Sequence, residues 1–241
     1  MDPVVPPLSP RLAALADAIA PGSRVADVGS DHGLLPLWLV ANGRAAYGLA
    51  TEKTETLLAG VTRPPAAAPW ARQLGYRAGD GLGALRPEDR IDTIVLAGLG
   101  GRTIARLLAS TGAAGPTLRR LVLQPRSEPA RLRLWLRQHG WRPVLERLTE
   151  ERGRFHLTLA AERGDDADLY THNTLSGAEL LTAGPLLARS RTPETDRYWR
   201  LERERFAGIV AGSGSGPSAA RARSGLALAH RVLAAISSPG E

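Results

Sequence analysis

A turn rich in carboxylates follows RVADVG, the first β-branched run of the chain. Its sequence is DVGSDHG, and its candidate ligand contacts are Asp27, Gly29, Ser30, Asp31 and His32. Glycine lets a ligand approach the backbone closely. The two carboxylates would repel a pyrophosphate, and this turn lacks the GxGxxG pattern of nicotinamide sites. S-adenosylmethionine suits the turn because it carries a sulfonium, an ammonium group and no phosphate. The alternative is an ordinary strand–helix turn with a capping aspartate.

Two further turns could complete a nucleoside site. Glu52 follows the second strand-like run, 25 positions after Asp27, where an acid is placed to accept hydrogen bonds from both ribose hydroxyls. The third run ends in Gly79, Asp80 and Gly81, and Asp80 could accept a hydrogen bond from an adenine amino group. The alternatives are a helix start, whose dipole favours Glu52, and a plain β-turn at residues 79–81.

A glycine-rich turn after the fourth run is expected on the acceptor side of the same site. Its residues are Ala97, Gly98, Leu99, Gly100, Gly101 and Arg102. Such a turn leaves room for a flat base to approach a methyl donor. Gln124, Pro125 and Arg126 follow the fifth run and could line the same cleft, with Arg126 near a phosphate. Close packing of a helix on a strand is the alternative role of the glycines.

Strand-like and helix-like runs alternate around these turns. Strands are expected at residues 24–29, 45–51, within 76–85, 91–98 and 119–125, and helices at 8–19, 34–43, within 52–61, 100–110 and 128–140. In the last helix, Leu132, Trp135 and Leu136 are expected on one face and the arginines, Arg133 among them, largely on the other. Runs 141–151 and 153–162 flank Arg152-Gly153 and predict a β-hairpin. The expected class is α/β: a Rossmann-like, mostly parallel sheet with an antiparallel edge hairpin.

The composition changes after residue 164, where an acidic linker begins. Helices are expected at 177–191, 192–212 and 219–238, with a flexible Gly/Ser turn at 212–218. We therefore predict two domains, a donor-binding α/β domain over residues 1–164 and a small helical domain over 165–241.

Charge and composition limit the classes of partner that the protein is expected to bind. The formal net charge is +7, and the 31 basic residues include one lysine. Nucleotide bias in a GC-rich genome explains the choice of arginine, but the excess of base over acid indicates a polyanionic partner. The absence of cysteine and the scattered histidines argue against a metal site. The apolar stretches are too short to span a bilayer and the N-terminus does not resemble a secretory leader, so a cytoplasmic protein is expected.

These motifs, in this order and spacing, resemble the TrmK family of bacterial tRNA (adenine-N1)-methyltransferases. The resemblance rests on LSPRL, DVGSDHG, Ala50-Thr51-Glu52, GDGL, IDTIVLAGLGGRTIARLL, LVLQP, LRLWLRQHGW and EERGRFHLTL, and it runs roughly from residue 8 to 162. Leu99 stands where the family usually has Met, a volume-conserving change. The C-terminal helices, interrupted by GSGSGPS, lack regular heptads.

The resemblance implies a class I fold, a coiled-coil-like C-terminal domain, and methyl transfer from S-adenosylmethionine to N1 of a tRNA adenine, conventionally adenine 22. Asp31 and Asp80 are candidates to stabilise the cationic product base, with His32 as a base-contacting group. A monomer is favoured. Other possibilities are a methyltransferase for another RNA or a small molecule, a nicotinamide-dependent oxidoreductase, and a non-catalytic RNA-binding protein.

Overall fold

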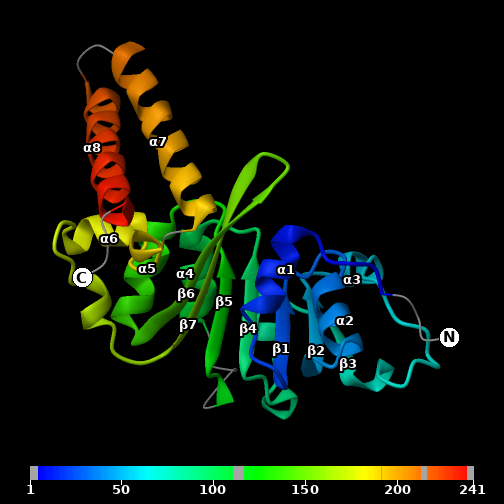
Figure 1. Ribbon diagram of the computed structural model, residues 1–241. Helices are drawn as coiled ribbons and strands as arrows, with labels where there is room; N and C mark the ends of the chain where they lie inside the picture. The colour runs from blue at the N-terminus through cyan, green and yellow to red at the C-terminus, as the bar shows by residue number, and fades with distance from the viewer. Residues whose placement is uncertain (1–4, 111–116, 191, 213–215, 238–241) are drawn as a thin grey trace.

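The described part of the chain contains one seven-stranded mixed sheet in a computed structural model that covers residues 5–110, 117–190, 192–212 and 216–237 (Figure 1). The strands are β1 Ser23–Val28, β2 Ala45–Glu52, β3 Leu74–Ala78, β4 Thr93–Ala97, β5 Arg120–Gln124, β6 Trp141–Glu151 and β7 Arg154–Arg163. Their order is β3-β2-β1-β4-β5-β7-β6, in which β1 to β5 are parallel and β7 is antiparallel to both neighbours. The predicted α/β class with an antiparallel edge is confirmed.

Helices cover both faces of this sheet. They are α1 Pro10–Asp17, α2 Leu34–Ala41, α3 Glu55–Ala59, α4 Gly101–Ala109 and α5 Pro129–Gln138. Successive residues of β4 serve the two cores: Val95 packs with α1 and α2, whereas Ile94 and Leu96 pack with α4 and α5. Burial on both faces explains the continuous apolar run of this strand. The helix expected within 52–61 is short, because β2 continues to Glu52 and Thr54 caps the helix start.

The hairpin of β6 and β7 extends past the carboxyl end of β5. Leu123 pairs with Leu159, so residues 154–157 have no partner on β5, which ends at Gln124. Arg152 (φ 52°) and Gly153 (φ 73°) form the predicted two-residue turn, where a positive φ at both positions matches the strand twist. The tip therefore stands over the carboxyl edge of the sheet (Figure 1).

The segment after β7 is helical. Its elements are the 3-10 helices η6 Ala167–Tyr170 and η7 Leu187–Arg189 and the α-helices α6 Gly177–Ala183, α7 Pro193–Gly212 and α8 Pro217–Ser237. Helices α7 and α8 form a helical hairpin, which projects from the same end of the sheet as the β6–β7 tip (Figure 1). Residues 213–215 of the expected Gly/Ser turn lie outside the described residues. The domain division at residue 164 stays a prediction.

The helix expected at 177–191 is wrong in extent, because it is interrupted at Gly184. This residue has φ 96°, and a Cβ there would lie 2.6 Å from Arg133 Nη2 and 2.7 Å from Glu146 Oε2. Only glycine fits such a backbone and such a close approach. Residue 191 itself lies outside the described residues. A short α6 and the 3-10 helix η7 therefore replace one long helix.

The sequence predicts Arg133 on the face of α5 opposite its apolar residues, but the structure buries this side chain. Its side chain is 1% exposed, and Nε lies 2.6 Å from Glu146 Oε1 on β6. The guanidinium also donates to the carbonyls of Leu181 and Thr182, and Glu146 accepts from the backbone of η7. Helix α5 is covered by the sheet on one side and by α6 on another, so a residue beside its apolar face becomes buried. This ion pair joins the helical segment to the sheet.

Two kinds of feature, membrane spans and metal-binding clusters, are absent from the described residues. No described helix is long and apolar enough to cross a membrane. Within the same residues, no group of three or more histidine, aspartate or glutamate side chains could hold a metal ion.

Candidate active site

The DVGSDHG turn lies at the carboxyl end of β1, beside the point where the strand order reverses. Strand β1 has β2 on one side and β4 on the other, which is where open α/β sheets bind ligands. Gly29, Asp31 and Gly33 all have positive φ, at 74°, 56° and 67°. The backbone N–H groups of Gly29 and Ser30 both donate to the carbonyl of Thr51 at 3.0 Å. The turn is thereby folded toward the end of β2.

Asp27 is a buried carboxyl group at the base of this turn. Its side chain accepts a 2.5 Å hydrogen bond from the hydroxyl of Ser30. Burial is the main cause that raises the pKa of Asp27 to about 6, with a smaller contribution from the nearby Glu52, against the lowering effects of the Ser30 hydrogen bond and the charge of Arg11. A buried anion of this kind is costly in the free protein. A cationic ligand beside it would offset that cost.

Glu52 connects the three predicted donor turns. It is 9% exposed, and its Oε1 accepts a 2.6 Å hydrogen bond from the backbone N–H of Asp31. Its own carbonyl accepts from the N–H of Gly79 at 2.8 Å. The first, second and third turns therefore meet at one residue, as expected from parallel strands that end at the same edge.

The candidate catalytic side chains stand at the rim of this region. The side chains of Asp31 and His32 are 84% and 72% exposed, and the closest approach between them is 3.8 Å. Asp80 is exposed as well. Gly81 (φ 55°) packs against α4, because a Cβ there would lie 2.7 Å from Leu107 Cδ2. The assigned chemical roles of Asp31, His32 and Asp80 stay predictions.

The glycine turn after β4 divides into two parts. Gly98 (φ 75°) has open space beside its Cα. Gly101 serves packing, because a Cβ there would lie 2.4 Å from the carbonyl oxygen of Glu128. Leu99 packs against the core, and Arg102 pairs with Glu128 at 3.0 Å on an exposed surface. Gly98 is therefore the member of this turn best placed for a ligand.

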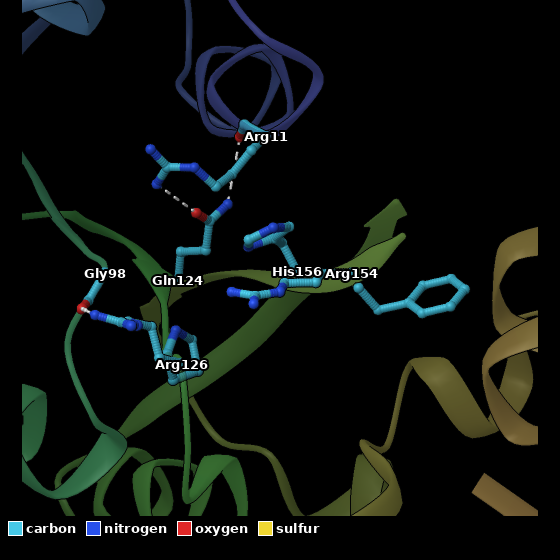
Figure 2. A pocket seen from close by; sticks show the side chains of 8 residues that line it. Arg11, Gly98, Gln124, Arg126, Arg154 and His156 are labelled. Atoms are coloured by element: carbon cyan, nitrogen blue, oxygen red, sulfur yellow. Dashed lines mark hydrogen bonds between the residues drawn. The ribbon is translucent and has the colours of Figure 1, made fainter. Parts of the chain in front are cut away.

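A cavity of about 470 Å³ lies next to Gly98 at the carboxyl edge (Figure 2). We call it the arginine cavity. It is lined by Arg11, Gly98, Gln124, Pro125, Arg126, Arg154, Phe155 and His156. The predicted residues Gln124, Pro125 and Arg126 are thus brought together with Gly98, and the N–H of Arg126 donates to the carbonyl of Leu99 at 2.8 Å. Arg102 does not line this cavity.

Gln124 holds the α1 side of the arginine cavity in place. Its Oε1 accepts from Arg11 Nη1 at 3.1 Å, and its Nε2 donates to the Arg11 carbonyl at 3.3 Å (Figure 2). The same Nε2 donates to Thr158 Oγ1 at 3.2 Å. The backbone N–H of Arg11 donates to Glu151 Oε2 at 2.9 Å. The buried amide of Gln124 is therefore occupied by protein groups and fixes the position of Arg11.

Arg11, Arg154 and His156 were not among the site residues predicted from the sequence. Burial lowers the pKa of His156, and the positive charge of Arg11 lowers it further, so the imidazole is neutral at neutral pH. Strand alternation offers a signal that could have found the β7 residues: Arg154, His156 and Thr158 share one face of the strand. This face of β7 forms part of a cavity only because α1, which carries Arg11, lies against it.

Comparisons with known proteins agree with this geometry. The model of the TrmK family, described as tRNA (adenine(22)-N(1))-methyltransferase, matches residues 25–224. The tRNA (adenine(22)-N(1))-methyltransferase of Bacillus subtilis is 32% identical over 195 residues, 81% of each chain. A Streptococcus pneumoniae protein regarded as a tRNA (m1A22) methyltransferase was crystallised with S-adenosyl-L-methionine. Its TM-score is 0.80 at 30% identity, covering 94% of this chain and 100% of that one. The crystal structure of the B. subtilis enzyme has a TM-score of 0.79 at 27% identity over 94% of this chain and 99% of that one.

Proposed function

The chain belongs to the TrmK family of tRNA (adenine(22)-N(1))-methyltransferases, and on this premise we propose that it methylates N1 of adenine 22 in tRNA with S-adenosylmethionine as donor. The observation that carries the proposal is the buried Asp27 carboxyl beside Glu52 at the switch point of the sheet. The cytoplasmic location and the monomeric state expected from the sequence belong to this proposal.

The residues at the ends of β1, β2 and β3 fit the donor. Asp27 is an anion that gains from a neighbouring cation, since burial opposes its charge. Glu52 supplies a second carboxylate, which has acceptor positions for the ribose hydroxyls besides the one that the N–H of Asp31 uses. We assign Asp80 the role of accepting a hydrogen bond from the adenine amino group of the donor. When bound, S-adenosylmethionine supplies an electrophilic methyl group, and its sulfur keeps the electron pair of the broken C–S bond.

The acceptor base belongs on the β4 side of this region. Asp27 pairs with Val95, so Gly98 follows at the end of the adjacent strand and leaves open space for a flat ring. Adenine N1 has an in-plane lone pair at neutral pH, so the protein need not remove a proton first. The work of the chain is to hold N1 in line with the methyl group. The base must leave its stack to expose its Watson–Crick edge. Asp31 or Asp80 then stabilises the positive charge that N1 methylation creates.

Transfer of labelled methyl from S-adenosylmethionine to unmodified tRNA tests the proposal, with the product nucleoside identified by mass spectrometry. N1-methyladenosine at position 22 is the expected product. A tRNA whose adenine 22 is replaced by guanine is the matched control and should stay unlabelled. Donor binding without transfer to tRNA would instead indicate another RNA or a small acceptor, and no donor binding would overturn the proposal.

A further inference from the structure

Twelve arginines of the described residues form salt bridges, and the three that line the arginine cavity are not among them. Salt bridges are recorded for the guanidinium groups of Arg77, Arg102, Arg120, Arg131, Arg133, Arg137, Arg142, Arg147, Arg197, Arg200, Arg205 and Arg231. Among the described residues, no salt bridge is recorded for the side chains of Arg11, Arg126 or Arg154, although all three line one cavity. Three like charges that face one space favour an anion inside it.

The three guanidinium groups come from distant parts of the chain. Arg11 begins the first turn of α1, Arg126 follows β5, and Arg154 begins β7 at the hairpin tip. Figure 2 shows their side chains around the same space, with Gly98 at one side. Since Gly98 also borders the proposed place of the base, an anion in the arginine cavity would lie beside the target nucleotide.

Hydrogen bonds fix the position of Arg11 in the cavity wall. The buried Gln124 side chain contacts both the guanidinium and the backbone carbonyl of Arg11, and Thr158 completes the hydrogen bonds of that amide. The guanidinium of Arg11 meets the neutral amide oxygen of Gln124 and keeps other donors for a ligand. His156 stays neutral at neutral pH because burial and Arg11 lower its pKa, so it adds a hydrogen-bonding group without a fourth charge.

We propose that the arginine cavity binds the phosphodiester groups that flank the target nucleotide, with Arg11 and Arg154 as RNA-binding residues alongside Arg126. Arginine presents a planar fork of donors that matches phosphate geometry. Several guanidinium groups suit consecutive phosphates of one strand better than the lone carboxylate of the methyl donor. This inference rests on the tRNA methyltransferase activity proposed above.

Steady-state kinetics with unmodified tRNA at pH 8 test the inference. Arg154→Gln and Arg11→Gln should each raise KM for tRNA about tenfold, the effect of one charge-assisted hydrogen bond, with kcat little changed. Each variant should also reduce the slope of log affinity against log salt by about 1. Arg154→Lys should restore the salt slope, because it restores a positive charge near the phosphate.

Arg119→Gln is the matched control. Arg119 is exposed next to the amino end of β5, at the opposite edge of the sheet, and should leave both KM and the salt slope unchanged. Because Arg154 is exposed at a hairpin tip, its replacement tests the cavity even if Arg11→Gln fails to fold.

Calorimetry with S-adenosylmethionine distinguishes the two anions that the cavity could bind, a tRNA phosphate and the carboxylate of the methyl donor. Unchanged donor affinity in both variants, together with weaker tRNA binding, supports the inference. Weaker donor affinity with unchanged tRNA affinity overturns it and assigns the arginines to the donor carboxylate. If the wild-type chain methylates tRNA and both variants match Arg119→Gln, the inference fails while the proposed function stands. If the wild-type chain does not methylate tRNA, the proposed function fails, and direct tRNA binding by the same variants still tests the cavity.

Discussion

The two halves of the carboxyl edge carry opposite charges. On the β1–β3 side, Asp27 and Glu52 lie at the carboxyl ends of β1 and β2 and Asp80 follows β3, and the buried Asp27 has a pKa raised to about 6 by burial. On the β5–β7 side, Arg11 and Arg154 line the arginine cavity. The division falls at the switch point between β1 and β4. One sheet edge can therefore bind a cationic donor beside the carboxylates and a polyanionic acceptor beside the arginines.

The largest expected effect is a loss of stability on replacing Arg133, which lies in neither half of the carboxyl edge. Arg133→Met should lower the free energy of unfolding by about 4 kcal/mol, because Glu146 would stay buried without its cation. Urea denaturation measures the loss. The double variant Arg133→Met/Glu146→Leu should recover part of it, since it removes both buried charges but leaves the backbone N–H groups of Leu186 and Leu187 without their acceptor. A loss below about 1 kcal/mol in the single variant would show that the pair is not the clamp between α5, β6 and the helical segment.

Gly29→Val tests whether the acidic half of the carboxyl edge binds the donor, because it adds a side chain to the turn after β1. Gly29 has φ 74°, and a Cβ there would have no atom within 4 Å, so a Cβ adds backbone strain without a contact of its own. The new side chain would occupy donor space, and we expect donor affinity to fall at least about 100-fold, or roughly 2.7 kcal/mol. Calorimetry with S-adenosylmethionine measures the change.

Gly43→Val provides the matched control for this variant. Gly43 has φ 65° and equally open surroundings, but it precedes β2 at the opposite edge. Both variants carry comparable strain, and Gly43→Val should keep normal donor affinity. Equal losses in the two variants would mean that strain, and not contact with the donor, explains the effect.

The charge of Asp27 predicts how donor affinity depends on pH. Its pKa is about 6 in the free protein, and a bound cation would lower it, so donor binding below pH 6 releases a proton. Donor affinity should therefore fall about tenfold for each pH unit below 6. Calorimetry from pH 5 to 8, in two buffers of different ionisation enthalpy, measures the affinity and the proton release. Asp27→Asn should bind weakly at every pH, without this slope, whereas a wild-type affinity independent of pH would contradict the assignment.

The same group has the opposite effect on the stability of the free protein. Because the folded pKa of about 6 exceeds the ordinary value of 3.8, the folded state binds the proton more tightly than the unfolded state. The contribution of Asp27 to stability therefore grows as pH falls from above 6 toward 3.8, by up to about 3 kcal/mol. Donor affinity and the stability contribution of Asp27 should change in opposite directions over this range.

The grouping of the acidic residues at one edge can be predicted from the sequence more readily than the arginine cavity, because of the distances along the chain. Each donor turn follows its own strand, so the alternation of strands and helices places Asp27, Glu52 and Asp80 at one edge. The arginine cavity needs α1 to lie against the hairpin of β6 and β7, and no local pattern links Arg11 to Arg154. The burial of Arg133 depends in the same way on α6, which packs against α5 from 40 and more residues away.

The two halves also influence each other, and this coupling gives the smallest expected effect. Arg11 lowers the pKa of Asp27, although burial, Ser30 and Glu52 all act more strongly. Arg11→Gln should therefore move the pH midpoint of donor binding slightly upward, while donor affinity at pH 8 stays unchanged because Asp27 is already charged there. Calorimetry across pH on this variant and on Arg154→Gln measures the shift. Arg154 is not among the causes that shift the pKa of Asp27, so its variant should keep the wild-type midpoint. Equal midpoints in all three proteins would show that the acidic and basic halves bind their ligands independently.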